Sequence, residues 1–136
     1  MSEENPSIVS HLSIGSNHFE KALSFYDSVM PTLGARQVMK FEGAVAYGRA
    51  YPEFWVQSPI DGNPAAPGNG THISFIAASQ EQVRAFWDAA LAAGATPDGA
   101  PGLRAEYGES YYACFVRDLD GHKIEAAHIP ITTEVG

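Results

Sequence analysis

Two histidines and one glutamate have the residue types and the spacing of a metal site. His11 and His72 lie 61 positions apart, inside similar segments at residues 10–14 and 71–75, and Glu125 lies near the end of the chain. Two imidazoles and one carboxylate bind Fe(II), Mn(II), Zn(II) and similar cations while leaving coordination positions open. A metal with open positions can bind substrate oxygens or activate water.

The alternative is that these histidines are surface or hydrogen-bonded residues without a ligand. Their equivalent positions, together with a carboxylate expected on a strand that faces the same way, favour metal binding. The other three histidines are predicted to be structural or exposed to solvent. His122 and His128 lie on the opposite alternation phase from Glu125, and His18 lies where a helix is expected to begin.

An internal repeat must position these residues. Residues 24–27 match residues 85–88 at the same offset of 61, and the Gly-Ala pair that begins at Gly34 matches the pair that begins at Gly94 at an offset of 60. Three matches in one order and at nearly one spacing indicate two copies of the same unit. The chain therefore consists of two modules of one design.

Each module is predicted to be a βαβββ unit within one domain that spans residues 1–136. The first module covers residues 8–58 and the second covers residues 71–129. A linker at residues 59–70 is rich in Pro and Gly. Strands are predicted at residues 8–14, 36–41, 44–49, 53–58, 71–77, 103–106, 111–117 and 122–129.

A helix follows the first strand of each module, because apolar residues recur there at helical spacing. Capping-box spacing predicts that the helices begin after Asn17 and Ser79, and Gly34 and Gly94 are expected to end them. The fold class is therefore α+β, with a curved mixed sheet around a cleft. The helices cover one sheet face, and we expect the two histidines and the glutamate to converge on the other.

Aromatic and basic residues are expected to line this cleft. Trp55 offers a flat surface for an aromatic or acyl substrate, with packing between the two halves as an equal alternative. Tyr47 and Arg49 share one strand face and are predicted to contact substrate. Arg49 could bind a substrate carboxylate or phosphonate, although a surface salt bridge is the more common role for such an arginine.

A glycine-rich segment at residues 99–108 is predicted to be a mobile loop over the cleft. It carries Arg104, a catalytic candidate, and Tyr107, a substrate-binding candidate. Tyr111 and Tyr112 follow, and either phenol could serve as an acid or a hydrogen-bond donor near a bound metal. The sequence leaves open which of these two tyrosines faces the cleft.

The chain resembles the vicinal oxygen chelate superfamily, which includes glyoxalases, bleomycin-resistance proteins and extradiol dioxygenases. The resemblance covers roughly residues 8–129. It is carried by residues 10–14, 25–27, 71–75 and, most specifically, Asp118-Leu119-Asp120-Gly121-His122-Lys123-Ile124-Glu125. It implies the glyoxalase/bleomycin-resistance/dioxygenase fold, with His11, His72 and Glu125 as ligands of a divalent ion such as Fe, Mn, Zn or Ni.

One departure from this family bears on the reaction. Glyoxalase I-like members place a fourth, acidic ligand where this chain has Trp55, and Glu53 lies two residues earlier. Glyoxalase I chemistry is therefore in doubt. The resemblance still implies a metal-dependent enzyme of lyase, ring-cleaving dioxygenase or thiol-transfer type, acting on a small oxygen-rich substrate. It also implies a homodimer. A metal-free protein that sequesters a small molecule such as an antibiotic is the alternative.

Charge and composition exclude some partners. The net charge of −8, with no cluster of Lys and Arg, disfavours nucleic-acid binding. No apolar stretch approaches the roughly 20 residues of a membrane span. The acidic, polar N-terminus lacks the features of a secretory signal, and the single Cys114 has no partner for an internal disulfide. We therefore expect a cytoplasmic protein that does not bind membranes.

Overall fold

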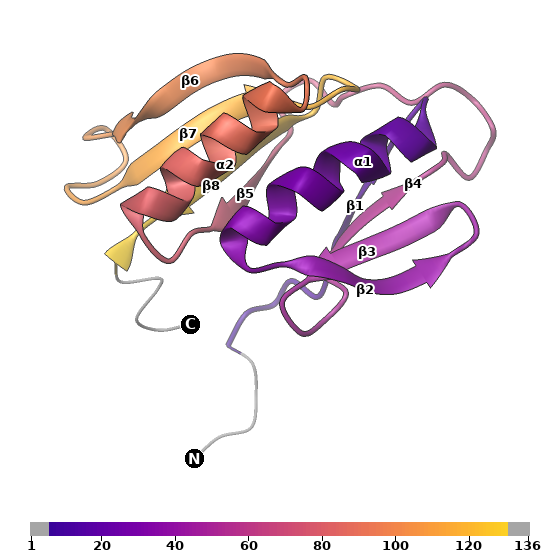
Figure 1. Ribbon diagram of the computed structural model, residues 1–136, viewed down its shortest axis with the longest axis horizontal. Coiled ribbons are helices and arrows are strands. Elements are labelled where there is room, and N and C mark those ends of the chain that lie inside the picture. Colours follow the sequence, from indigo (N-terminus) through magenta and orange to yellow (C-terminus); the bar gives the residue numbers. More distant parts are fainter. Residues whose placement is uncertain (1–5, 131–136) are drawn as a thin grey trace.

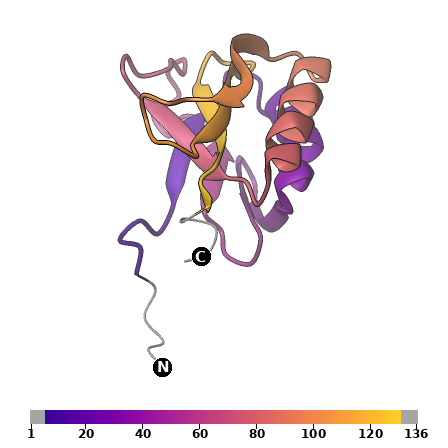
Figure 2. The same ribbon diagram turned by 90° about the vertical axis from the view of Figure 1, so that its left-hand side faces the viewer.

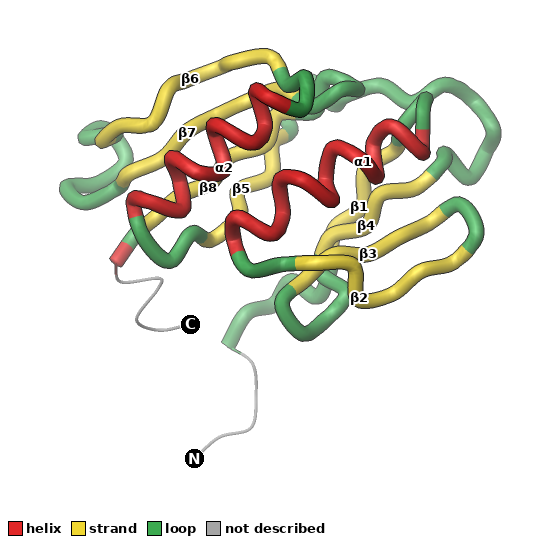
Figure 3. The backbone as a smooth tube through the Cα atoms, in the orientation of Figure 1, coloured by secondary structure: helices red, strands yellow, loops and turns green. Residues whose placement is uncertain are grey.

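The computed structural model describes residues 6–130 and contains the two predicted modules (Figure 1). The first module contains β1 (Leu12–Gly15), α1 (Phe19–Val29), a short 3-10 helix η1 (Met30–Leu33), β2 (Arg36–Phe41), β3 (Ala44–Gly48) and β4 (Phe54–Gln57). The second contains β5 (His72–Ile76), α2 (Gln80–Ala92), β6 (Thr96–Leu103), β7 (Tyr112–Arg117) and β8 (Lys123–His128). The connection from β4 to β5 has neither helix nor strand (Figure 3).

Each module forms its own four-stranded mixed sheet, so the predicted curved sheet is divided into two. The strand orders, β1-β4-β3-β2 and β5-β8-β7-β6, are the same arrangement. In each sheet the first strand runs parallel to the last, and the other neighbours are antiparallel. Ser13 pairs with Trp55, and Ser74 pairs with Glu125. Trp55 and Glu125 therefore occupy equivalent positions, as the repeat predicts.

Both helices lie on the same side of the sheets, and α1 and α2 contact each other (Figure 2). The core forms between this helical layer and the sheets, where Tyr26, Phe86 and Ile124 are buried. The rings of Phe54 and Phe75, whose centroids are 5.0 Å apart, join the cores of the two modules. The opposite sheet faces remain free of helices. In the described part of the chain, neither helix is long and apolar enough to cross a membrane.

The start of α2 follows the predicted capping pattern, whereas the start of α1 does not. Ser79 Oγ accepts a hydrogen bond from the amide of Gln82 at 3.1 Å, and Gln82 Oε1 accepts one from the amide of Ala78 at 2.8 Å. The first residue before α1 is His18, without a side-chain cap. The Asn17 side chain is engaged instead with the backbone of Ala65 in the linker, at 2.7 and 3.0 Å.

Strand β6 is placed differently from the sequence prediction, and β1 also begins later than predicted, at Leu12 and not at residue 8. Residues 99–103, predicted to begin a mobile loop, belong to one edge strand, Thr96–Leu103. Residues 104–108, which include most of the weak strand predicted at residues 103–106, form a loop with a turn after it. The two prolines and two glycines of β6 obscure the period-two alternation. An edge strand tolerates proline because only one of its sides must donate to the ladder. The pairing with β7 shifts register between Pro97 and Gly99 and again before Gly102.

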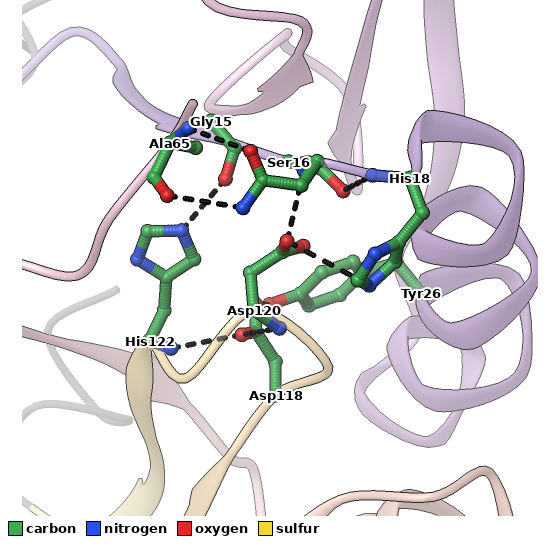
Figure 4. Close-up of polar contacts among 9 residues, drawn as sticks. Gly15, Ser16, His18, Tyr26, Ala65, Asp118, Asp120 and His122 are labelled. Atoms are coloured by element: carbon green, nitrogen blue, oxygen red, sulfur yellow. Dashed lines mark hydrogen bonds and ion pairs between the residues drawn. The ribbon is translucent and has the colours of Figure 1, made fainter. Parts of the chain in front are cut away.

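The turn between β7 and β8 attaches the second module to the first (Figure 4). Asp118 is buried and accepts hydrogen bonds from the Tyr26 hydroxyl at 2.5 Å and from the amides of Asp120 and His122 at 2.9 Å. Burial and the Asp118 carboxylate raise the pKa of Tyr26 well above its ordinary value. The hydroxyl therefore stays protonated and keeps donating.

Asp120, in the same turn, lies beside the start of α1. Its Oδ1 accepts a hydrogen bond from the amide of Asn17 at 2.9 Å and lies 3.6 Å from Nε2 of His18 (Figure 4). A carboxylate at a helix N-terminus is favourable because the free amides there carry partial positive charge. An acid of the second module thus lies at the N-terminal end of the first module's helix and contacts the two residues that precede it.

Two basic side chains hold the modules together reciprocally. His122 Nε2 donates to the carbonyl of Gly15 at 2.7 Å, and Arg49 Nη2 donates to the carbonyl of Ile76 at 2.9 Å. Gly15 and Ile76 end the first strands of the two modules and are related by the repeat offset of 61. Each module therefore donates a hydrogen bond to the equivalent carbonyl of the other module. These two contacts fix the orientation of the modules relative to each other.

Candidate functional site

The second module carries its candidate residues on the sheet face opposite the helices. In β8, Ile124 and Ala126 are buried in the core, so Glu125 between them points to the other face. In β5, Ile73 and Phe75 pack against the core, and His72 lies on the same face as Glu125. Strand alternation in two parallel neighbours thus brings an imidazole next to a carboxylate.

Glu125 is the centre of a short hydrogen-bonded chain. Its Oε1 lies 3.2 Å from His72 Nε2, and its Oε2 accepts a hydrogen bond of 2.6 Å from the Tyr111 hydroxyl. The Glu125 side chain is 1% exposed, whereas the His72 side chain is 46% exposed. A buried carboxylate is costly unless its oxygens are bonded, and both are. Glu125 is therefore the buried anchor, and His72 forms the accessible side of the cluster.

The two adjacent tyrosines have different roles. Burial and the hydrogen bond to Glu125 raise the pKa of Tyr111 to about 12, so its phenol is a protonated donor at neutral pH. Tyr112 points toward α2, where its hydroxyl lies 3.2 Å from Arg84 Nη1. The structure thus places Tyr111 in the cluster and Tyr112, the other catalytic candidate, away from it, because neighbouring strand residues point to opposite faces.

On the first module, the equivalent face is more open. His11 lies just before β1, is exposed, and has its Nδ1 3.0 Å from Ser10 Oγ. Trp55 is half-buried and stacks on Phe41, with ring centroids 6.1 Å apart and an angle of 12° between the planes. His11 and Trp55 line an open groove of about 970 Å³. Trp55 therefore lies at this groove and not between the halves.

One chain does not assemble the three predicted ligands. Within residues 6–130, no group of three or more His, Cys, Asp or Glu side chains is close enough to share one ion. His72 and Glu125 are brought together, but His11 is not part of their cluster. The expectation that all three converge within a single chain is therefore not met, because the two modules lie side by side with their helices packed together.

The two residues that do meet fit adjacent positions around a metal. Ligands about 2 Å from a tetrahedral ion lie about 3.3 Å from each other, and the His72 and Glu125 atoms are 3.2 Å apart. A neutral imidazole and a carboxylate also suit several first-row cations. This pair can therefore supply two ligands of a divalent ion, and a third must come from elsewhere.

Tyr47 and Arg49 occupy structural positions. Tyr47 is buried, and its hydroxyl donates to Asp27 Oδ1 at 2.9 Å; burial and this contact raise its pKa. Arg49 donates to the carbonyls of Leu33 and Ile76 at 2.8 and 2.9 Å. Both border a cavity of about 230 Å³ between the modules. Arg49 is therefore engaged by backbone carbonyls at the module junction and, within the described residues, forms no surface salt bridge.

Arg104 and Tyr107 lie beside the Glu125 cluster. Arg104 Nη2 donates to the carbonyl of Ala100 at 2.6 Å, and its guanidinium carbon is 5.5 Å from the centroid of the Phe115 ring. The Tyr107 ring lies 5.3 Å from that of Tyr111. Both predicted residues are thus placed next to the site, although Tyr107 is largely exposed.

The sequence analysis did not single out Phe115 and Lys123. Phe115 pairs with Glu125, and Lys123 pairs with His72. The Lys123 Nζ is 5.1 Å from the Phe115 ring centroid. Counting outward from the predicted turn at residues 118–121 would have paired Phe115 with Ile124, one residue short of its observed partner, because the turn is closed by Asp118 and His122.

Comparisons with known proteins agree with this architecture. The sequence model of the Glyoxalase/Bleomycin resistance protein/Dioxygenase superfamily matches residues 8–126. A glyoxalase/bleomycin resistance protein of known structure from Albidiferax ferrireducens T118 is similar at 37% identity and a TM-score of 0.83, covering 91% of this chain and 100% of that one. A search among curated proteins gave no match.

Two more distant structures share the fold. A glyoxalase-related enzyme from Fulvimarina pelagi is 18% identical with a TM-score of 0.71, covering 93% of this chain and 91% of that one. A lactoylglutathione lyase from Agrobacterium tumefaciens is 17% identical with a TM-score of 0.60, covering 92% and 96%. With the family match over most of its length, this chain belongs to the glyoxalase/bleomycin resistance protein/dioxygenase superfamily.

Proposed function

We propose that this protein is a divalent-metal-dependent enzyme that acts on a small oxygen-rich substrate, with His72 and Glu125 as two of the metal ligands. The observation that supports this most directly is the contact between an accessible imidazole and a buried carboxylate, 3.2 Å apart, on a sheet face without helices. A buried carboxylate is costly unless it is paired or coordinates a cation, and an accessible imidazole beside it leaves room for such a cation.

The third ligand in this proposal is the partner's His11, in a homodimer. His11 is exposed and lies outside the cluster of its own chain. The helix-free faces of both modules are available to a second copy (Figure 2). A two-fold dimer that places the first module of one chain over the second module of the other would form two equivalent sites. It would also enclose each Glu125 cluster between two sheets.

The residues of the chain then have distinct tasks. A bound ion would polarise neighbouring substrate oxygens and stabilise negative charge that develops on them. Tyr111 holds a proton at its hydroxyl, 2.6 Å from Glu125, and orients that carboxylate. Trp55 and Phe41 offer a stacked apolar wall to the substrate body. Because Trp55 takes the position equivalent to Glu125, a four-ligand site is disfavoured, and dioxygenase, transferase and other lyase reactions are favoured.

A second candidate function is the sequestration of a small molecule without turnover. It is supported by the same Glu125, whose two oxygens are already satisfied by His72 and Tyr111 without a metal. The stacked pair of Phe41 and Trp55 beside an open groove also suits a flat ligand. A cytoplasmic location remains, for either function, a prediction from the sequence.

Elemental analysis of protein purified without chelators separates the two functions. The enzyme proposal predicts about one Fe, Mn, Zn or Ni ion per chain, lost in His72→Ala and in Glu125→Gln. His18→Ala is the matched control, because His18 lies near Asp120, away from the cluster, and this variant should keep its metal. Protein that is free of metal yet binds a small molecule tightly would favour sequestration instead.

A further inference from the structure

Two positive side chains flank one aromatic ring beside the Glu125 cluster. The Arg104 guanidinium carbon lies 5.5 Å, and the Lys123 Nζ lies 5.1 Å, from the centroid of the Phe115 ring. The His72 ring lies 6.4 Å from the same ring. Since Phe115 pairs with Glu125 and Lys123 pairs with His72, both cations border the proposed metal ligands. This placement is notable in a chain whose net charge is −8.

Strand β6 is shaped to accommodate the Arg104 side chain. A Cβ at Gly99 would lie 3.0 Å from Phe115 Cδ1 and 3.3 Å from Arg104 Nη2, and a Cβ at Gly102 would lie 3.1 Å from Arg104 Nη1. The carbonyl of Ala100 accepts a hydrogen bond from the same guanidinium at 2.6 Å. A larger residue at either glycine would displace the arginine. The two glycines therefore allow the guanidinium to lie against the strand in one orientation.

Neither cation forms an ion pair with a residue of the described part of the chain. Among residues 6–130, the ion pairs are His18 with Asp120, His72 with Glu125, and Arg117 with Asp98. On this face Glu125 is bonded by His72 and Tyr111, and Asp98 is bonded by Arg117, the strand partner of Lys123. The Phe115 ring offers both cations a favourable quadrupole but no compensating charge. Within residues 6–130, two half-buried positive charges thus lie next to the cluster without an ion-pair partner.

We propose that Arg104 and Lys123 form an anion-binding subsite, so that the substrate of this site is a small organic anion carrying a carboxylate, phosphate or phosphonate group. The planar guanidinium suits two oxygens of such a group at once, and the lysine adds a point charge. The apolar body of the ligand lies against Phe115. The assignment of this anion as substrate rests on the proposed function, but the subsite itself depends only on these three side chains.

Titration calorimetry with matched probes tests this subsite. Benzoate and phenylphosphonate carry the anionic group on an aromatic body, and benzamide has nearly the same shape without the charge. The parent protein should bind both anions more tightly than benzamide. Binding should weaken at higher ionic strength, because the contact is electrostatic. Failure of both anions to bind the parent at millimolar concentration, or equal binding of benzamide, would overturn the proposal.

Substitution of Arg104 and of Lys123 tests whether the anions bind at these two side chains. In Arg104→Gln and in Lys123→Gln, the affinity for both anions should fall about tenfold or more, with little change for benzamide. Arg104→Lys should recover part of the loss, because it keeps the charge without the planar fork. Arg36→Gln and Lys21→Gln are matched controls that remove exposed charges elsewhere and should bind as the parent does. Unchanged anion binding in both site variants would refute the subsite.

Titrations with and without bound metal distinguish a failure of the anion subsite from a failure of the proposed metal-dependent function. The same titrations are run on protein as purified and after dialysis against a chelator, with the metal content measured in each sample. If no metal is found but the site variants still lose anion binding, the proposed function fails and the subsite stands. If metal is present and depends on His72, but the site variants bind the anions normally, the proposed function stands and the subsite fails.

Discussion

Glu125 and Cys114 show how single residues are adapted to their surroundings. Glu125 is a buried charge with a partner on each oxygen, His72 and Tyr111. Cys114 is a buried thiol whose Sγ lies 3.6 Å from the carbonyl of Val83. The sequence predicted the sheet face of Glu125, because alternation places residue 125 opposite its apolar neighbours, but not its burial. The contact of Glu125 with Tyr111 depended on loop geometry that alternation does not specify.

Cys114 is predicted to be unreactive in the native protein. Burial raises the pKa of its thiol to about 12, so almost no thiolate is present near pH 8. An aromatic disulfide reagent should detect one thiol per chain only in denaturant. Because the folded pKa is raised, the thiol favours the native state below its ordinary pKa of about 9, and this contribution is lost as the pH rises through about 12. Rapid labelling of native protein would contradict the prediction.

Tyr26→Phe is predicted to destabilise the protein by about 1–3 kcal/mol, because it leaves an oxygen of the buried Asp118 without its donor. Urea unfolding followed by circular dichroism measures the free energy of unfolding. Tyr51→Phe removes a hydroxyl from a side chain that is 71% exposed and should be neutral within error. Equal stability of the two variants would show that the contact between Tyr26 and Asp118 does not stabilise the fold.

At the scale of elements, the sequence predicted those whose apolar residues keep a clear period. Strand β2 has the predicted bounds, and β3, β4, β7 and β8 differ from prediction by one or two residues at their ends. Strand β6 was missed because Pro97, Gly99, Pro101 and Gly102 interrupt its alternation, while pairing with β7 still holds it as an edge strand. The contact of Asp120 with Asn17 at the start of α1 was also missed, since the two residues are 103 positions apart in the sequence.

Ser79→Ala is predicted to lower the free energy of unfolding by about 1 kcal/mol, because Ser79 accepts the amide of Gln82 at the start of α2. Ser24→Ala, at an exposed position within α1, should leave the stability unchanged or slightly higher, since alanine favours the helix interior. Urea unfolding followed by circular dichroism measures the free energy of unfolding of both variants. A larger loss in Ser24→Ala than in Ser79→Ala would contradict the assigned cap.

At the scale of the whole molecule, the repeat predicted two equivalent modules but not how they lie against each other. Their orientation depends on Arg49 and His122, which bind equivalent carbonyls across the junction. Residue periodicity carries no information on such long-range contacts. This orientation keeps His11 out of the cluster of His72 and Glu125, which is why we propose a shared site.

The protein is therefore predicted to be a homodimer in solution. Light scattering coupled to gel filtration should give a mass near twice the 14.6 kDa of one chain. The exposed apolar side chains Met39 and Phe41, on the open side of the first module, would be partly covered in such a dimer. A monomeric mass at micromolar concentration would refute the dimer and with it the shared site.

Metal binding by mixed dimers tests the central claim most directly. His11→Ala removes one proposed ligand, and a His72→Ala/Glu125→Gln double variant removes the other two, so neither homodimer has a complete site. Coexpression of the two chains with different tags gives a mixed dimer, in which one site regains all three ligands. The account predicts that purified mixed dimers bind about one divalent ion each, while both homodimers lose it. Full metal content in His11→Ala alone, or no recovery in the mixed dimer, would contradict it.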